Sequence, residues 1–355
     1  MNMQQVRLGR TDLVVPVCGL GGIPFGRDHL TDTAAEDLVR RAIDAGLTLI
    51  DTFSNYGRSE LRIGRALQGR RDRVTLVTKA RASFTPKDFS DHIDGALARL
   101  QVECIDILLL KNIDNDACVA NIPALSEVVA RVKAQGKIRF AGLSSHSPEH
   151  ACRAIETGAI DVAEVPYNYA NRVFEKVLDL AVARDVGILA MKPLGGGRLF
   201  GEAAKGSSDT LETLVAALSF AMSHTCRPVL IPGIGTDMEL DRYLEAIPRL
   251  LILSDTEKQA LIEQAQDLGT EFCRGCGYCR SVCPSGIPID EILPLLDRFE
   301  HIRTDQTYRQ QLAREFAAIG ADPTACRDCR KCIEECPFKL PVPERLKQAF
   351  AVLTR

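Results

Sequence analysis

The chain has 355 residues, 46% of them hydrophobic, and a formal net charge of −3. This length indicates one large domain with a smaller one rather than a single ordinary domain. The charge balance argues against bulk nucleic-acid binding and against attraction to anionic lipid. There is no run of about 18 apolar residues to predict a transmembrane helix. Residues 1–16 lack the long apolar core of a signal peptide, so we expect a cytoplasmic protein.

Strand-like apolar runs alternate with amphipathic helical stretches from about residue 15 to residue 250. Eight such runs are rich in Val, Ile and Leu on both faces, which is typical of buried parallel strands. They cover residues 15–22, 47–53, 73–80, 104–112, 138–146, 161–169, 187–193 and 227–235. Eight strand–helix repeats favour a (β/α)8 TIM barrel over a doubly wound open sheet. The residues before Val15 predict a short hairpin over the lower mouth of this barrel.

Polar side chains stand at the carboxyl ends of these predicted strands, where barrels of this kind carry their active sites. The set contains Asp51, Tyr56, Lys79, Lys111, Ser144, Ser145, Glu164 and Lys192, followed by Gly233, Gly235 and Thr236 in a glycine-rich segment. Titratable groups gathered at one mouth are often functional. We therefore expect the active site among these residues.

Three of the polar residues predict a proton donor. An unperturbed Tyr has a pKa of about 10, and we expect the ammonium of Lys79 to lower that of Tyr56. Asp51 would hold the lysine in place and keep it charged. Tyr56 could then protonate a carbonyl oxygen while hydride arrives at carbon. The alternative is that Asp51 and Lys79 form a structural ion pair inside the barrel.

A surplus of positive charge is also predicted at this mouth. Lys79, Lys111 and Lys192 should converge there, and three cations in one cavity repel each other unless anions offset them. Asp51 and Glu164 would offset two. We hypothesise that a cofactor pyrophosphate binds near Lys192 and that a carboxylate or phosphate of the substrate binds near Lys111. The alternative for Lys192 is that it only caps strand carbonyls.

The sequence changes character after the last predicted strand. Residues 254–269 predict a helical linker with Ser254 as its N-cap, so we expect a barrel domain at 1–253 and a second domain at 254–355. Residues 288–304 and 307–320 of this second domain read as helices. The remaining residues include eight of the thirteen cysteines, packed into two short runs. Metal ligation is a better interpretation of these runs than disulfides.

The two cysteine runs share the pattern C-x2-C-x2-C-x3-C-P. Three thiolates within seven residues can wrap one cubane, and the fourth reaches the neighbouring cluster. The expected ligands are Cys273, Cys276, Cys279 and Cys336 for one [4Fe–4S] cluster and Cys326, Cys329, Cys332 and Cys283 for the other. A pair of zinc sites is the weaker alternative, because zinc usually takes two separated C-x2-C pairs. The runs resemble bacterial two-cluster ferredoxins, with a longer spacer, and imply an α-helical ferredoxin-like domain.

Several segments of the barrel resemble the aldo/keto reductases. They are DTFSNYGRSE at 51–60, VTK at 77–79, GLSS at 142–145, VPYN at 165–168 and IPGIG at 231–235. The resemblance implies an NAD(P)H-dependent carbonyl reductase that uses Asp51, Tyr56 and Lys79 as catalytic residues. Lys111 stands where the family has a fourth catalytic residue, a His, and a lysine can still donate a hydrogen bond there.

The same resemblance implies a cofactor site. Ser144 and Ser145 stand where the family holds the nicotinamide amide with Ser and Asn, and Glu164 stands near its Gln. The segment with Gly233, Gly235 and Thr236 completes the cofactor site. Near the adenosine 2′-phosphate, NADPH users of the family commonly carry a basic residue, whereas this chain has Asp237 and Glu239. The sequence therefore does not favour NADPH over NADH.

The two predicted domains carry different kinds of redox chemistry. Clusters pass single electrons, nicotinamide passes a hydride, and no flavin motif is evident to convert one into the other. One hypothesis is a reductase whose clusters exchange electrons with a partner protein or an unrecognised flavin. A second keeps hydride chemistry in the barrel and makes the clusters structural or redox-sensing. A third is an electron-transfer protein with a non-catalytic barrel. We favour an enzyme, because Asp51, Tyr56 and Lys79 are all present.

Overall fold

The computed structural model describes residues 3–26, 30–195, 199, 210–267, 273, 278–301, 306–322, 325–336 and 339–354. The chain divides into two compact units. The first comprises Met1–Leu194 with Ser208–Ser254, and the second comprises Gly195–Ser207 with Asp255–Arg355. The sequence-based boundary at 253/254 lies one residue before the division at Ser254, and it assigns residues 195–207 to the barrel.

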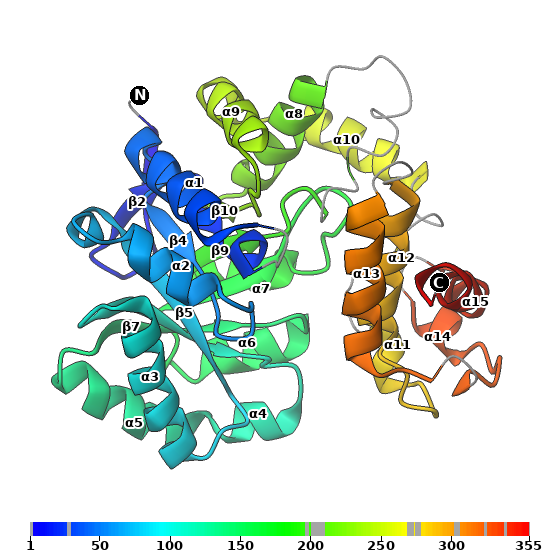
Figure 1. The fold of residues 1–355 in the computed structure, drawn as a ribbon, viewed down its shortest axis with the longest axis horizontal. Coiled ribbons are helices and arrows are strands. Elements are labelled where there is room, and N and C mark those ends of the chain that lie inside the picture. The colour runs from blue at the N-terminus through cyan, green and yellow to red at the C-terminus, as the bar shows by residue number, and fades with distance from the viewer. Residues whose placement is uncertain are drawn as a thin grey trace. The chain divides into compact units, whose positions relative to one another are not determined.

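Eight parallel strands form the sheet of the first unit, each paired with the next one along the chain (Figure 1). They are β3 (Leu20–Gly21), β4 (Leu49–Asp51), β5 (Thr75–Arg81), β6 (Ile105–Lys111), β7 (Ile138–Ser144), β8 (Val162–Pro166), β9 (Gly187–Met191) and β10 (Val229–Ile231). Parallel bridges from Cys18 to Leu230 and from Gly21 to Gly233 join the first strand to the last. The sheet therefore closes into the predicted TIM barrel.

Helices connect successive strands on the outside of the barrel (Figure 1). They are α1 (Asp32–Ala45), α2 (Ser59–Ala66), α3 (Pro86–Leu100), α4 (Asp116–Ala120), α5 (Ile122–Ala134), α6 (Pro148–Glu156), α7 (Glu175–Arg184), α8 (Thr210–Met222) and α9 (Asp237–Ala246), with short 3-10 turns at Ile23–Gly26, Arg71–Arg73 and Ile247–Arg249. Helix α1 illustrates how the sequence sets their ends. Thr31 accepts a hydrogen bond from the Ala34 N–H at its start, and Gly46 closes it with a φ of 106°, a conformation that favours glycine.

A hairpin seals the amino-terminal end of the barrel. Strands β1 (Gln5–Arg7) and β2 (Val14–Pro16) pair antiparallel, as predicted for the residues before Val15. Leu8 and Leu13 of this hairpin are buried in one cluster with side chains from inside the barrel. The interior residues of that cluster are Leu49, Val77, Ile107, Leu109, Val162, Leu189, Val229 and Ile231. The barrel is thus packed with apolar side chains at this end.

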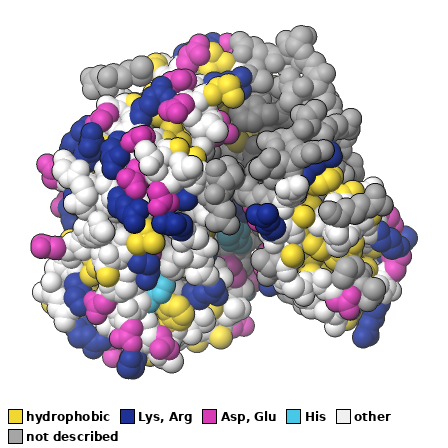
Figure 2. Space-filling view, in the orientation of Figure 1, with side chains coloured by type: hydrophobic (Ala, Val, Ile, Leu, Met, Phe, Trp, Pro, Cys, Tyr) yellow, Lys and Arg dark blue, Asp and Glu magenta, His cyan; other side chains and the backbone are white. Residues whose placement is uncertain are grey.

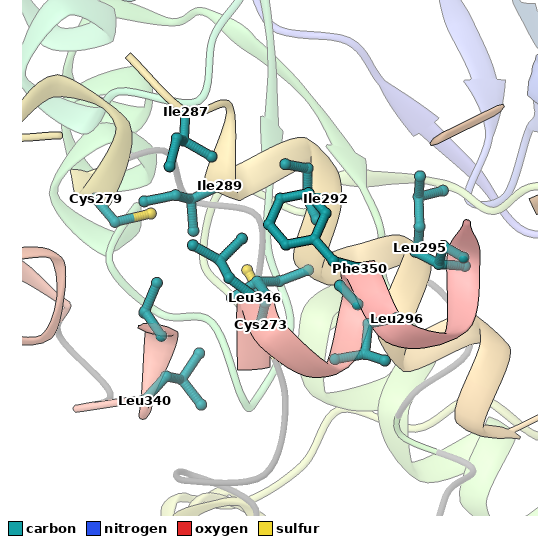
Figure 3. Packing of buried hydrophobic residues seen from close by; sticks show 14 of the residues in the cluster. Cys273, Cys279, Ile287, Ile289, Ile292, Leu295, Leu296, Leu340, Leu346 and Phe350 are labelled. Atoms are coloured by element: carbon teal, nitrogen blue, oxygen red, sulfur yellow. The ribbon is translucent and has the colours of Figure 1, made fainter. Parts of the chain in front are cut away.

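The described residues of the second unit form short and medium helices. They are α10 (Asp255–Asp267), α11 (Tyr278–Ser281), α12 (Ile289–His301), α13 (Gln306–Ile319), α14 (Lys331–Glu335) and α15 (Val342–Leu353). The three helices predicted from the sequence correspond to α10, α12 and α13. Side chains from α12, including Ile292 and Leu296, pack with Leu346 and Phe350 from α15 in one apolar core (Figure 3).

The visible surface of the barrel mixes both signs of charge. Lys and Arg side chains alternate with Asp and Glu over the face that carries α1 and α2 (Figure 2). On this face Arg40 pairs with Glu36, and Arg58 and Arg65 pair with Asp32. Among the described residues, no helix combines the length and the apolar character needed to cross a bilayer.

Candidate active site and metal centre

Lys79 lies at the centre of a buried group of charges. The Lys79 side chain is 1% exposed. Asp51 and Glu164 are also buried, with 4% and 2% of their residue surfaces exposed. Lys79 Nζ donates hydrogen bonds to Asp51 Oδ1 and to the Thr52 carbonyl oxygen, and it lies 3.4 Å from Glu164 Oε2. These residues come from β5, β4 and β8, so barrel closure is what brings them together.

Burial and neighbouring charges shift the pKa values of Asp51 and Lys79. Burial raises the pKa of Asp51 to about 7, the Glu164 charge adds to this rise, and Lys79 opposes it. Burial alone would lower the pKa of Lys79, but Asp51 and Glu164 outweigh that effect and hold this pKa above its ordinary value. Lys79 therefore stays an ammonium throughout the neutral range.

Tyr56 stands beside this group in the loop that follows β4. Its ring packs edge-on against Phe53, with centroids 5.6 Å apart, and its centroid lies 5.7 Å from Lys79 Nζ. A Cβ atom on Gly26 would lie 1.8 Å from the Tyr56 carbonyl oxygen. Only a glycine there lets the segment before α1 pack this closely and hold the Tyr56 loop.

The expected effect on the Tyr56 pKa is wrong in its net direction. Burial raises this pKa above its ordinary value, and the opposing effect of Lys79 does not cancel the rise. Tyr56 is therefore fully protonated near neutral pH. This state suits a proton donor.

Lys111 ends β6 at the same mouth. Its Nζ atom lies 5.3 Å from the centroid of the Phe53 ring, the ring that also contacts Tyr56. Burial, followed by the charge of Lys79, lowers the pKa of Lys111. In the part of the chain that the structure describes, no carboxylate lies within ion-pair distance of this ammonium. Among the described residues, Lys111 thus has no matching anion, and it lies beside the proposed proton donor.

Lys192 and His146 form a second basic contact at the mouth. Lys192 follows β9 in the left-handed region, with a φ of 55°, and its Nζ atom lies 3.4 Å from His146 Nε2. Burial, followed by the charges of Lys192 and Lys111, lowers the pKa of His146 well below its ordinary value. A neutral imidazole can accept a hydrogen bond from Lys192. The convergence predicted for the three lysines is consistent with these contacts.

Ser144 and Ser145 have different environments despite being adjacent. The Ser145 hydroxyl contacts the Ile113 carbonyl oxygen at 2.7 Å and Asp114 Oδ1 at 2.8 Å. Asp114 also accepts the backbone N–H groups of His146 and Ser147. Ser145 therefore holds the loop after β6, and to hold a nicotinamide amide as predicted it would have to break these bonds.

Ser144 and Glu164 offer the atoms that a nicotinamide amide requires. They are partners in register on β7 and β8; the buried Ser144 Oγ has no hydrogen-bond partner, and Glu164 Oε2 has only the ion-pair contact with Lys79 at 3.4 Å. Buried polar atoms are normally paired, so orphaned ones need an explanation. A primary amide could donate to both oxygens or accept from the hydroxyl. The residues present thus fit a nicotinamide at this mouth.

The glycine-rich segment leads into α9 through a capping box. Thr236 Oγ1 accepts from the Glu239 N–H at 3.1 Å, and Glu239 Oε2 accepts from the Gly235 N–H at 2.7 Å. Glu239 therefore places a carboxylate on an amide at the start of this helix, where an anionic ligand could otherwise bind. This role of Glu239 escaped the sequence interpretation, although Thr-x-x-Glu before a helix is its usual signature.

Four of the predicted cluster ligands surround one cavity in the second unit. Cys283, Cys326, Cys329 and Cys332 line it together with apolar residues such as Ile287. This is the set expected for one cluster, including the cysteine from the distant run. Among the described residues, no three His, Cys, Asp or Glu side chains converge tightly enough to hold a single metal ion. Four thiols around a cavity fit a [4Fe–4S] cubane.

The other predicted ligands lie in the apolar core of the second unit. Cys273, Cys279 and Cys336 are buried there with side chains from α12 and α15; Figure 3 labels the first two. The fourth member of this set, Cys276, lies outside the described residues. The structure thus brings three of these four cysteines into one core, and their role as ligands remains a prediction.

Comparison with known proteins bears on both units. The model of the aldo/keto reductase family matches residues 18–213, more than half of the chain. The chain belongs to the aldo/keto reductase family. The model of a 4Fe-4S dicluster domain matches residues 269–340. The predicted fusion of an aldo/keto reductase barrel with a two-cluster domain is confirmed, and the protein is an oxidoreductase of this family.

Individual relatives cover the barrel of this aldo/keto reductase. It is 27% identical to the NADH-specific methylglyoxal reductase of Escherichia coli (strain K12), over 56% of this chain and 70% of that protein. The holo form of AKR11C1 from Bacillus halodurans matches with a TM-score of 0.65 and 22% identity, covering 74% of this chain and 96% of that one. An aldo/keto reductase from Klebsiella pneumoniae in complex with NADP and acetate matches with a TM-score of 0.62 and 24% identity, covering 74% and 95%. The two structural likenesses show the fold.

Proposed function

We propose that this aldo/keto reductase reduces a carbonyl compound to an alcohol with a nicotinamide cofactor, using Tyr56 as the proton donor. The observation that carries the proposal is the position of Lys79, held by Asp51 and Glu164 next to the Tyr56 ring. The orphaned Ser144 hydroxyl lies at the same mouth. The name of the Escherichia coli relative, an NADH-specific reductase, supports the same type of reaction.

Each residue at the mouth of the barrel has a separate role in this reaction. The nicotinamide, when bound, supplies the hydride that reaches the carbonyl carbon, and Ser144 and Glu164 would hold its amide. Tyr56 transfers its proton to the carbonyl oxygen, so that an alcohol forms and a tyrosinate remains. The Lys79 ammonium stabilises that tyrosinate, because the two charges are close in a buried site. Asp51 positions the lysine through the hydrogen bond that it accepts.

We infer that the cofactor is NADH rather than NADPH. The family resemblance places the adenosine 2′-phosphate near the start of α9. There Glu239 already occupies the Gly235 N–H, and Asp237 lies in the same first turn of the helix. A 2′-phosphate at this point would meet the Asp237 and Glu239 carboxylates, and the nearby Arg41 cation is already paired with Asp237. Like charges repel, so the phosphate is disfavoured here. The neutral ribose hydroxyl of NADH avoids that cost.

We also infer that the substrate carries a negative charge. Lys111 has no carboxylate partner among the described residues, and it lies on the Phe53 ring that Tyr56 contacts. A half-buried cation of this kind is stabilised when an anion binds beside it. A carboxylate on the substrate would supply that anion and would orient the carbonyl group toward Tyr56. Lys192, in contact with His146, would serve the cofactor pyrophosphate.

The second unit would hold two [4Fe–4S] clusters on the eight cysteines of the two runs, as assigned above. The cavity lined by Cys283, Cys326, Cys329 and Cys332 supports the sharing of one ligand between runs. We propose that the clusters exchange electrons with a partner protein. The flavin considered above gains no support, since neither family model that matches this chain describes a flavin protein.

The Tyr56→Phe variant tests the proposed reaction. In the full-length protein purified without oxygen, we expect NADH oxidation by aldehydes and 2-oxo acids to fall at least about 100-fold in kcat. The dissociation constant of NADH should not change. Tyr243→Phe, at a buried position on α9, is the matched control and should retain activity. If Tyr56→Phe keeps the wild-type rate, the barrel is not catalytic by this route, and an electron-transfer or redox-sensing role becomes the better account.

A further inference from the structure

Asp297 is an exception within the core of the second unit. Among the described residues of that unit it is the only polar residue that is buried, with 1% of its surface exposed. It lies on α12, one turn after Leu293 and directly after Leu296, and both leucines are buried. A helix position that faces a core is normally apolar. The carboxylate therefore calls for a functional explanation.

Both oxygens of this carboxylate have partners in other segments. Asp297 Oδ2 accepts a hydrogen bond from the backbone N–H of Cys273 at 3.0 Å. Asp297 Oδ1 accepts from an Nη atom of Arg345 on α15, whose side chain is 13% exposed. Asp297 thus joins the first cysteine run to α12 and α15. Figure 3 shows Cys273 in the same core as Leu296 and Leu346 of these helices.

The buried ion pair of Asp297 with Arg345 is better explained by a role in positioning Cys273 than by a contribution to stability. A buried ion pair adds little to stability compared with apolar side chains of the same size, because desolvation offsets the attraction. Such a pair is best understood when it fixes a geometry. Here the fixed atom is the amide nitrogen of Cys273, the first predicted ligand of its cluster. Arg345 lies between Pro343 and Leu346, which line the cavity of the other predicted cluster.

We propose that Asp297, held by Arg345, is a positioning residue that fixes the backbone of Cys273, the first predicted ligand of its cluster. The proposal rests on the two clusters of the proposed function. It makes two statements about the chain. Loss of the carboxylate impairs assembly of the cluster on Cys273, Cys279 and Cys336 more than assembly of the other. Loss of its charge alone leaves the Arg345 cation near that cluster and shifts the cluster's reduction potential to a less negative value.

Metal analysis and redox titration of the full-length protein test these statements. The wild type should contain about eight irons and eight sulfides per chain, since each cluster holds four of each. We expect Asp297→Leu to retain about four irons. Asp297→Asn keeps an oxygen for the Cys273 N–H, so it should retain both clusters, and one of its two potentials should become less negative. Glu344→Gln, which removes an exposed carboxylate from the same helix α15, should match the wild type.

The outcomes separate this proposal from the one on which it rests. Wild-type protein without iron would contradict the clusters themselves. Wild-type protein with about eight irons, together with Asp297→Asn titrating at both wild-type potentials, would overturn the positioning role. Should Asp297→Leu not accumulate as folded protein, the redox titration of Asp297→Asn decides alone. Arg345→Gln should shift the reduction potential of this cluster, and Arg345→Lys, which keeps the positive charge, should stay close to the wild-type potential. Equal shifts of the potential in these two variants would also overturn the proposal.

Discussion

Ser144 and Glu164 are partners in register on β7 and β8, where the buried Ser144 Oγ has no hydrogen-bond partner and Glu164 Oε2 has only the ion-pair contact with Lys79 at 3.4 Å. If these oxygens bind a nicotinamide amide, Ser144→Ala should weaken NADH binding about fivefold, since one hydrogen bond contributes about 1 kcal/mol. The same change should not lower the melting temperature without NADH, because the hydroxyl has no partner to lose. Ser145→Ala is the contrasting control and should lower the melting temperature, because it breaks the contacts to Ile113 and Asp114. Titration of NADH and thermal unfolding measure both effects.

Glu239 provides a test of cofactor choice. We expect Glu239→Gln to lower the ratio of KM for NADPH to KM for NADH by about tenfold, which corresponds to about 1.4 kcal/mol, because the repulsion of a 2′-phosphate is removed. The glutamine oxygen can still accept from the Gly235 N–H, so the start of α9 should stay intact. Asp241→Asn removes a charge from the same helix that is paired with Arg41, and it should leave the ratio unchanged. An equal ratio in Glu239→Gln and the wild type would refute the role of Glu239.

Lys111 provides a test of substrate charge. In Lys111→Met the side chain keeps its length and loses its charge, so kcat/KM for a 2-oxo acid should fall about 100-fold. For a neutral aldehyde of the same size the loss should be much smaller. Lys87→Met, at an exposed position on α3, controls for the change in net charge. Equal losses for the acidic and the neutral substrate would show that Lys111 does not recognise an anion.

His146 makes the stability of the barrel depend on pH. Its folded pKa is depressed well below its ordinary value of 6.5, so its contribution to stability is full above pH 6.5 and is lost as pH falls below it. At pH 5.5, which is one unit below the unfolded pKa of His146, the free energy of unfolding has fallen by about 1.4 kcal/mol. Between pH 7.5 and pH 5.5, the free energy of unfolding of the wild-type barrel should fall by about 1.4 kcal/mol more than that of His146→Gln. Urea unfolding measures this difference. Identical pH dependence would contradict the depressed pKa of His146.

The barrel could be predicted because its signal is local. Eight apolar runs of strand length, each followed by a helical stretch, leave few alternatives for a chain of this size. Asp51, Lys79 and Lys111 could be placed at the mouth because they lie at or near the ends of these runs. The cysteine runs were equally direct, since their spacing alone predicts the ligand pattern.

Other features depend on distances that a sequence does not contain. The contact of Lys79 with Glu164 joins strands on different sides of the barrel. The net rise in the Tyr56 pKa follows from the depth of burial, which outweighs a charge that the sequence did reveal. Ser144 and Ser145 look equivalent in the sequence, and only the position of Asp114 distinguishes them. Asp297 appears as one acid among many in a helix, and its burial against Cys273 emerges only in the fold.

The closure of the barrel has a consequence for how the chain folds as it is synthesised. The first strand pairs with the last through Cys18 and Leu230, and Arg10 of the amino-terminal hairpin bonds to Asp185. These early residues must wait for partners that leave the ribosome much later, and contacts this distant in sequence slow folding. Until β10 emerges, the apolar interior of the nascent barrel has an open seam. A chaperone that covers that seam would therefore act mainly before residue 231 emerges from the ribosome.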